Sequence, residues 1–516
     1  MSENLSSLIR KNTMTNALVG VMRVLRGLLM ARWMYIYLGE EYYGFWGLLW
    51  AVFFYVVVLD FGFSKAAQKA TAERQYEHDP EHYNKVVGTV FSLQWMMSAV
   101  IVMATVAAMI WLKELTKVTD PGELSYCRKV LLIFGCGIAL TFPTGVLPEI
   151  LVGLKRIYLR NYVLLIGGLI EVVGTYVVLH TGGLLLPLTV MVIGLNLSAN
   201  MVMLVMIKRR LPGLRLRPTF HRKIVRELAD FSAFIYMHDI GSLIIGKTDR
   251  LVLSIISGLD AVGVYQIGTR LPDNFVSVTA QYRDNVAPLT ADFLKRGQKD
   301  ELCRTLIKGL RFTVWLAAGG AGVILVLTPE MLDFLFGARG GDAKLVCRLM
   351  VISAFFTVAM RDFAQRIMMM SGRHRLRCLL CWCEAVVNLG LSIYLTLKIG
   401  LIGVVIGTLV PNAIISLFVI LPYYSHFIRI PIGRFLKDVY LGPVAAAVTA
   451  SLAVWFFREG FLPWAWPLFV RLILLGLVYA AGYMVCSAYW VVSDAERTAL
   501  WSRGVRLVRG RLKWFR

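Results

Sequence analysis

The sequence predicts an all-α polytopic membrane protein with about fourteen transmembrane helices, arranged as two pseudo-symmetric six-helix lobes followed by two C-terminal helices. Three observations lead to this fold class. The chain of 516 residues is 58% hydrophobic and 17% charged with a mean hydropathy of +0.65, whereas soluble domains are about 45–50% apolar. Apolar stretches long enough to cross a bilayer recur along the whole chain, and part of the first half recurs in the second.

Each predicted span is an apolar stretch of roughly 20 residues, the length that a helix needs to cross a hydrocarbon core about 30 Å thick. Polar breaks delimit these spans near residues 14–37, 43–62, 87–112, 127–148, 161–181, 184–207, 231–256, 262–284, 306–328, 345–370, 378–398, 401–424, 439–457 and 464–492. No small-residue cleavage site follows the first span, so we expect it to stay in the membrane rather than to be removed as a signal peptide.

Charge patterning predicts the orientation. The chain carries 55 Lys and Arg against 32 Asp and Glu, a formal net charge of +23, and the basic residues gather in segments that face one side. Because cytoplasmic loops of membrane proteins are rich in Lys and Arg, the N- and C-termini are predicted to be cytoplasmic. Anionic membrane lipid is the expected partner of these segments. Nucleic acid is not, because no loop is long enough to hold a binding domain.

The spans and the basic segments together predict the domain organisation. We expect an N-terminal lobe over residues 1–207, a basic cytoplasmic linker over 208–230, a C-terminal lobe over 231–424, two additional helices over 425–492 and a basic cytoplasmic tail over 493–516. Within the tail, VRLVRGRLKWF mixes basic and bulky apolar residues at the short spacing of an amphipathic helix that lies on a membrane.

An internal repeat relates the two lobes. LGEEYYGFW, from Leu38 to Trp46, aligns without a gap on SGLDAVGVY, about 219 positions later. GLKRIYLRNY resembles SGRHRLRCLL at a similar offset, and each is followed by a span that ends in a glycine-containing turn, at Gly182 and Gly400. Each half has an even number of spans, so the repeats are predicted to be parallel, with a substrate cleft between them.

Charged residues inside the predicted spans are the candidate binding site, since a charge within a bilayer is costly and is usually functional. An excess of Arg favours an anion, because the planar guanidinium donates two hydrogen bonds at once to phosphate. The alternative interpretation for each position is an internal ion pair. The proposed substrate-binding residues are Arg23, Arg26, Arg32, Lys247, Asp249, Arg250, Arg270 and Arg361.

A second set of polar residues has two interpretations, as coupling sites for a proton or cation and as structural partners. Glu171 and Glu384 fit a coupling role because burial disfavours the charged form of a carboxyl, although hydrogen bonding between helices fits equally. The set comprises Asp60, Glu171, Asp239, Asp273, Asp362 and Glu384.

Metal and cofactor chemistry is not predicted. Cys378, Cys381 and Cys383 have the spacing of a metal motif, but they lie in an apolar span without further ligands, which favours packing. The sequence contains no carboxylate dyad, nucleophile elbow or phosphate-binding loop, so we expect neither a cofactor nor an enzyme.

Two stretches resemble a known family. ARWMYIYLGEEYYGFWGLLW, followed by LDFGFSKAAQKATAE, is similar to the start of the Wzx-type polysaccharide flippases, and TDRLVLSIISGLDAVGVYQIGTRL resembles a later helix pair of that family. The superfamily also contains lipid II flippases and multidrug and toxin extruders, and the resemblance covers roughly residues 10–430. Arg32, Asp60 with Gly62, and Asp249 with Arg250 match family positions, whereas Lys69 stands where the family often has Arg.

The resemblance implies a function and partners. It implies a bundle of two lobes that alternates between inward and outward openings in the bacterial inner membrane. It implies that the substrate is an undecaprenyl-diphosphate-linked oligosaccharide, a precursor of O-antigen, other lipopolysaccharide or exopolysaccharide. A polysaccharide polymerase and a chain-length regulator are the implied protein partners, and the two extra helices would form a groove for the isoprenoid tail.

Two other functions compete with flipping. A cation-coupled multidrug exporter of the same superfamily is expected to have a cavity of carboxylates and aromatic residues, which the Arg excess disfavours. A membrane-embedded glycan polymerase or ligase commonly carries its catalytic residues on a long external loop, and the predicted external loops are short. Membrane potential, a cation gradient or consumption of the product all fit as the driving force.

Overall fold

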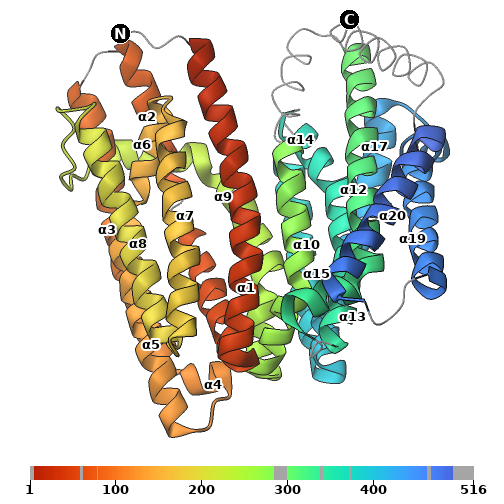
Figure 1. Cartoon of the computed structure of the whole chain (residues 1–516). Coiled ribbons are helices and arrows are strands. Elements are labelled where there is room, and N and C mark those ends of the chain that lie inside the picture. The colour runs from red at the N-terminus through yellow and green to blue at the C-terminus, as the bar shows by residue number, and fades with distance from the viewer. Residues whose placement is uncertain are drawn as a thin grey trace, which may run out of the picture. The chain divides into compact units, whose positions relative to one another are not determined.

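The computed structural model describes residues 5–58, 62–77, 80–283, 299–337, 341–370, 374–461 and 466–491, and every regular element among them is helical, which confirms the all-α prediction (Figure 1). The helices of the first half are α1 (Leu5–Val58), α2 (Phe63–Glu77), α3 (Pro80–Ile110), α4 (Leu112–Thr116), α5 (Pro121–Thr141), α6 (Val146–Gly153), α7 (Ile157–His180) and α8 (Leu185–Lys208). Those of the second half are α9 (Arg222–Ile256), α10 (Leu259–Arg283), α12 (Lys299–Phe336), α13 (Gly341–Phe356), α14 (Asp362–Met370), α15 (His374–Ile399), α16 (Leu401–Ile415), α17 (Leu421–Ile428), α18 (Ile432–Phe435), α19 (Gly442–Phe461) and α20 (Leu468–Trp490).

Four short irregular turns interrupt these helices. The first, η1 (Phe142–Gly145), is a 3₁₀ turn between α5 and α6. The other three, η2 (Thr357–Arg361), η3 (Ser416–Ile420) and η4 (Leu436–Leu441), are π-helical and join pairs of helices without a break in the chain direction. Because π-helical turns are rare and occur often at functional sites, these three positions bear on where the site lies.

Eleven helical stretches of the described residues are long and apolar enough to cross a membrane. One of them, Met14–Phe53, covers the predicted span 14–37 and the first part of the span 43–62, and the helical conformation is broken between them at Gly39. The predicted spans at 231–256 and 262–284 coincide with α9 and α10, which carry several of the candidate charges and are not among the eleven. The polytopic prediction is confirmed, and the number fourteen stays a prediction.

The backbone supports the predicted internal repeat. Gly39 has φ +78° and its sequence counterpart Gly258 has φ +91°, a left-handed conformation that side chains other than glycine rarely adopt. The second predicted pair behaves alike, with φ +81° at Gly182 and +64° at Gly400. The same positions of the two halves therefore turn the chain in the same way.

A reciprocal close contact joins the two copies of the aligned stretch. A Cβ added to Gly44 would overlap the carbonyl oxygen of Leu259, and a Cβ added to Gly263 would overlap that of Glu40. Gly44 corresponds to Gly263 in the repeat, and Glu40 corresponds to Leu259. Each helix therefore places its glycine against the equivalent carbonyl of the other, at a separation that only glycine permits.

The chain separates into two compact units. The first comprises residues 1–267 and 374–407, and the second comprises residues 268–373 and 408–516. A core of the first unit joins α2, α3, α6 and α8 through residues such as Val87, Leu147 and Ile207. In the second unit α12, α19 and α20 pack together, with Ala446 and Ala450 opposite Leu475 and Tyr479.

Candidate functional site

In the first unit, α1 and α7 lie side by side, and polar contacts at two levels fix their alignment along the helix axes. The buried Asn161 donates hydrogen bonds to Thr15 Oγ1 at 3.0 Å and to Asn16 Oδ1 at 2.7 Å. Further along the same two helices, Arg26 Nη1 donates to Glu171 Oε2 at 2.5 Å. The structure thus joins in an ion pair two residues for which the sequence suggests different roles.

Arg23 lies one turn before Arg26 and is exposed, while Arg32 is partly buried near the C-terminal end of the same predicted span. Arg160, at the start of α7, is partly buried. Arg160 was not among the predicted residues because it lies at the predicted end of a span, where a basic residue is expected to face the headgroups. Arg160 directly precedes Asn161, which donates hydrogen bonds to α1, and this neighbouring polar residue is the sequence signal that could have identified Arg160.

The central charged stretch lies on α9 and α10. Asp249 is buried, with 3% exposure, and accepts a hydrogen bond of 2.6 Å from Tyr265 Oη. Lys247 and Arg250 are partly buried on α9, and so is Arg270 on α10. Of the other predicted positions in this region, Asp273 is exposed on α10, and the side chain of Asp239 lies outside the described part of the chain. Asp60, predicted in the first half, lies outside the described residues altogether.

Arg361 ends a π-helical turn of the second unit and is held there by an amide. Its Nη1 donates to Asn412 Oδ1 at 2.9 Å. The Nδ2 atom of Asn412 donates in turn to the carbonyl and hydroxyl oxygens of Ser353 and to Thr357 Oγ1, each at 2.9 Å. Asn412 therefore fixes both ends of the turn, and with it the direction of the guanidinium.

Two tyrosines support the same turn. The hydroxyl of Tyr424 donates to the carbonyl of Met360 at 3.0 Å, and that of Tyr440 donates to the carbonyl of Ala359 at 3.1 Å. Both rings are buried. A π-helical turn displaces carbonyls from the regular α-helical ladder, and these hydroxyls satisfy two of them. Asp362, the next residue, is partly buried at the start of α14.

Glu384 belongs to a buried polar stripe on α15. It has 1% exposure, and Asn388, Ser392 and Thr396 follow it on the same face, all buried. Asn388 Nδ2 donates to the carbonyl of Gly407 on the neighbouring helix at 3.2 Å. Only Glu384 of this stripe was among the predicted residues, although polar residues at four-residue spacing in an apolar span are a visible signal.

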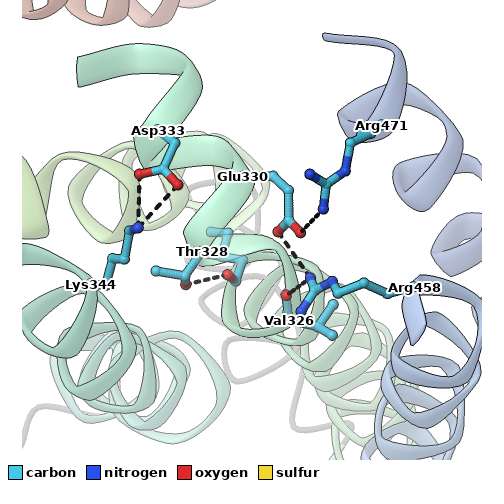
Figure 2. A network of polar contacts seen from close by, with 8 residues as sticks. Val326, Thr328, Glu330, Asp333, Lys344, Arg458 and Arg471 are labelled. Atoms are coloured by element: carbon cyan, nitrogen blue, oxygen red, sulfur yellow. Dashed lines mark hydrogen bonds and ion pairs between the residues drawn. The ribbon is translucent and has the colours of Figure 1, made fainter. Parts of the chain in front are cut away.

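A buried cluster of one Glu and two Arg was missed by the sequence analysis (Figure 2). Glu330 of α12 accepts from Arg458 Nη2 of α19 at 2.9 Å and lies 3.9 Å from Arg471 Nη2 of α20. Arg458 also donates to the carbonyl of Val326 at 2.6 Å. Glu330 and Arg458 fall just outside the ends of predicted spans, where the sequence suggests ordinary interfacial residues, whereas Arg471 lies inside the predicted span 464–492 and was passed over. In the structure they tie both C-terminal helices to α12.

An apolar cavity of about 480 Å³ lies beside this cluster, between α12, α13 and α19. Its lining consists of Ala, Gly, Val, Leu, Ile, Phe and one Ser, and no charged residue takes part. Val326 both lines the cavity and accepts the bond from Arg458, so the charged cluster marks one end of an apolar space.

Within the described residues, no group of three or more His, Cys, Asp or Glu side chains could hold a metal ion. Cys381 is buried between α9 and α15, with its Sγ 3.6 Å from the carbonyl of His238, whereas Cys383 is exposed. The polar and charged side chains of these helices can donate and accept hydrogen bonds and can compensate charge, which are the interactions that bind a polar or charged ligand.

Comparison with solved structures identifies the fold. The lipid II flippase MurJ, in an inward closed conformation, superimposes with a TM-score of 0.69 at 16% identity and covers 93% of this chain and 98% of its own. An inward-facing multidrug resistance transporter of the MATE family gives a TM-score of 0.65 at 15% identity, covering 81% of this chain and 99% of its own. At these identities the likeness establishes the fold.

Sequence comparisons establish the family. An uncharacterised membrane protein of Methanocaldococcus jannaschii is 24% identical over 200 residues, which are 39% of this chain and 39% of that protein. The family described as polysaccharide biosynthesis protein matches residues 9–281, more than half of the chain. The resemblance to polysaccharide flippases of this superfamily is thereby confirmed at the levels of family and fold, and the chain belongs to the polysaccharide biosynthesis protein family.

Proposed function

We propose that this protein is a flippase that translocates an undecaprenyl-diphosphate-linked oligosaccharide, or a related polysaccharide precursor, across the bacterial inner membrane. The family supports a role in polysaccharide synthesis, and the flippase-like fold supports translocation rather than covalent chemistry. Such a substrate combines a long apolar tail with a diphosphate and sugars. A protein that moves it needs an apolar surface for the first part and fixed hydrogen-bond donors for the second.

The observation that carries the proposal is the apolar cavity beside the C-terminal helices. An isoprenoid chain that leaves water or polar surroundings gains about 25 cal/mol for each Å² of apolar surface that it buries. The lining of small and branched apolar residues offers such a surface, and Val444, Ala447 and Val448 contribute it from α19. A cationic drug would meet no carboxylate among these lining residues, so the cavity favours a lipid tail over the substrate of a multidrug exporter.

The headgroup is assigned to the basic residues of the membrane helices. Arg361 is the best-supported member, because a guanidinium held by Asn412 is oriented before a ligand arrives, and less conformational entropy is then lost on binding. The other proposed contacts are Arg23, Arg32, Lys247, Asp249, Arg250 and Arg270, with Arg26 held by Glu171. Arg suits the diphosphate because its planar fork binds two phosphate oxygens at once.

Transport requires that the inward-open and outward-open conformations bind the substrate with different affinities. A ligand shifts the equilibrium between two conformations only by the difference in its affinity for them. Glu384 is the proposed coupling residue: a carboxyl with 1% exposure on a polar stripe changes charge when it binds a proton or a cation. The same observation favours the second candidate function, a cation-coupled multidrug exporter. For either function we propose that both termini lie in the cytoplasm. For the flippase alone, we propose a polysaccharide polymerase and a chain-length regulator as partners.

Binding measurements on the purified protein separate these functions. We expect undecaprenyl diphosphate to bind more tightly than farnesyl diphosphate, and farnesyl diphosphate more tightly than inorganic diphosphate, because each longer tail buries more apolar surface. Ala447→Phe, which fills the cavity, should weaken only the long-tailed ligand, by roughly tenfold or about 1.4 kcal/mol. Thr449→Phe, on the exposed face of α19, is the matched control. Equal affinity for the three ligands, together with tight binding of a cationic dye, would favour the exporter.

A further inference from the structure

The connection between α8 and α9 carries a dense group of positive charge. Between residues 208 and 226 the sequence has eight Lys and Arg and no Asp or Glu. All eight side chains are exposed: Lys208, Arg209, Arg210, Arg215, Arg217, Arg222, Lys223 and Arg226. In a flexible loop such charges would occupy many positions, whereas a connection held against the protein presents them at a defined place.

Four hydrogen bonds fix the connection to α3. Asn84 brackets it, since Oδ1 accepts from the backbone N–H of Arg215 at 3.0 Å and Nδ2 donates to the carbonyl of Gly213 at 3.1 Å. Further on, Thr219 N–H donates to the carbonyl of Gly88 at 3.3 Å, and Ser92 Oγ donates to the carbonyl of Thr219 at 2.9 Å. We call residues 213–219, bonded in this way, the strap.

Packing holds the strap as closely as hydrogen bonding does. Leu214 is buried in the core cluster that also contains Tyr83 and Val87 of α3. A Cβ on Gly88 would overlap Thr219 Oγ1 and lie 2.9 Å from the carbonyl of Arg217. The strap therefore lies directly on α3, with its backbone and Leu214 turned to the protein and the side chains of Arg215 and Arg217 exposed.

The part of α3 that the strap contacts indicates the depth of the strap relative to the membrane. Its contacts run from Asn84 to Ser92, about 12 Å along a helix that rises 1.5 Å per residue. This is the beginning of the membrane-crossing stretch Pro80–Ile110. Trp95, one turn beyond Ser92, is 46% exposed, and Phe220, next to the strap, is 57% exposed. Aromatic side chains at the end of a span are typical of the membrane interface, so the strap lies at headgroup level.

We propose that the strap is a docking surface for the anionic phospholipid headgroups of the adjacent leaflet, which is the cytoplasmic leaflet in the predicted orientation. The charge is complementary, because each Lys or Arg close to an anionic leaflet attracts it. The depth distinguishes a lipid from a soluble acidic partner, since the basic side chains are presented beside the bilayer edge with Phe220 among them. The proposal concerns the lipid surroundings and does not depend on the transported substrate.

The test uses the full-length protein in neutral detergent, titrated with phosphatidylglycerol or with phosphatidylcholine while the unfolding temperature is followed. A lipid that binds only the folded protein raises this temperature by mass action. We expect phosphatidylglycerol to stabilise the wild type, and Arg215→Gln with Arg217→Gln to need roughly 30-fold more of it, about fivefold for each charge removed. Lys113→Gln with Arg128→Gln, which removes two exposed charges on α4 and α5, should respond like the wild type.

A third variant tests the fixed geometry. Asn84→Ala removes the bracket and no charge, so we expect it also to lower the response to phosphatidylglycerol, measured against its own lipid-free unfolding temperature. Ser92→Ala provides the same test if Asn84→Ala fails to fold. Equal responses of the strap and control variants to phosphatidylglycerol would overturn the proposal. So would a wild-type response of both Asn84→Ala and Ser92→Ala. A stabilisation by soluble polyglutamate equal to that by the lipid would also overturn it.

Discussion

At the scale of single residues, the charged side chains within the membrane helices differ in what they are bonded to. Arg26 bonds a carboxylate, Asp249 accepts from a tyrosine hydroxyl, and Arg361 bonds an amide. A bond to a carboxylate compensates a charge, while a bond to a neutral amide orients it. Substitutions at the two arginine sites should therefore have different consequences, the first mainly for stability and the second mainly for binding.

Asn412→Ala tests the orienting role. We expect undecaprenyl diphosphate to bind about tenfold more weakly, since hydrogen bonds to charged groups contribute about 1.5–3 kcal/mol. The measurement is a binding titration, accompanied by an unfolding curve. Asn196→Ala is the control, because the Asn196 amide donates to the carbonyl of Val192 within its own helix. Equal affinity of the two variants would contradict a role for Asn412 in holding Arg361.

A double-mutant cycle tests the pair of Arg26 and Glu171. Glu171→Gln leaves a partly buried guanidinium without its carboxylate, so we expect a loss of stability that Arg26→Gln in the same chain partly restores. The expected coupling is about 1–3 kcal/mol, measured from unfolding midpoints. The exposed pair of Lys85 and Glu81 is the reference, with an expected coupling below about 0.5 kcal/mol. If the two coupling energies are equal, the Arg26–Glu171 pair does not stabilise the packing of α1 against α7.

At the scale of helices, the C-terminal pair is held by charge as well as by packing. Glu330 on α12 lies between Arg458 of α19 and Arg471 of α20, and its side chain has 5% exposure. Burying three charges is costly, and the arrangement is stable only while they compensate one another. The apolar cavity next to this cluster is lined by two of these helices, α12 and α19, so the cluster also helps to set the geometry of the proposed tail site.

Glu330→Gln should therefore destabilise the protein by about 3–5 kcal/mol, because it leaves two buried guanidinium groups facing each other. Asp333→Asn is the control: it breaks the neighbouring pair with Lys344, whose side chains are 27% and 26% exposed, and should cost about 1 kcal/mol or less. Thermal unfolding compares the two. Similar losses in both variants would show that the cluster does not hold the C-terminal helices in place.

The reciprocal glycine contact gives a prediction on α1 and α10. Gly44→Ala and Gly263→Ala each place a methyl group where a carbonyl oxygen of the other helix lies, so we expect each to cost about 1–3 kcal/mol. Gly167→Ala, which meets no atom within 4 Å, should be neutral or stabilise by about 0.5–1 kcal/mol, since glycine weakens a helix. Thermal unfolding in detergent measures all three. A wild-type unfolding temperature for both contact variants would contradict the close packing.

At the scale of the whole molecule, the sequence predicts what depends on local pattern. The all-α fold, the break at Gly39 and the repeat that relates Gly39 to Gly258 follow from hydropathy, from glycine and from an internal match. The partners of charged residues do not follow, because Arg26 and Glu171 are 145 positions apart and a single sequence carries no distance between them. The cluster at Glu330 was missed for a related reason: at the end of a span, a buried charge and an interfacial one have the same local pattern. The division into two six-helix lobes stays a prediction.

The most direct test of the central proposal is flipping of a fluorescent undecaprenyl-diphosphate glycan in proteoliposomes. The wild type should move the glycan to the far leaflet, and Arg361→Ala and Ala447→Phe should each reduce the initial rate by about tenfold or more, while Thr449→Phe retains it. Uptake of a cationic dye is followed in the same vesicles. Movement of the dye without the glycan, or wild-type flipping by both site variants, would contradict the assignment of this protein as a flippase that binds its substrate at these positions.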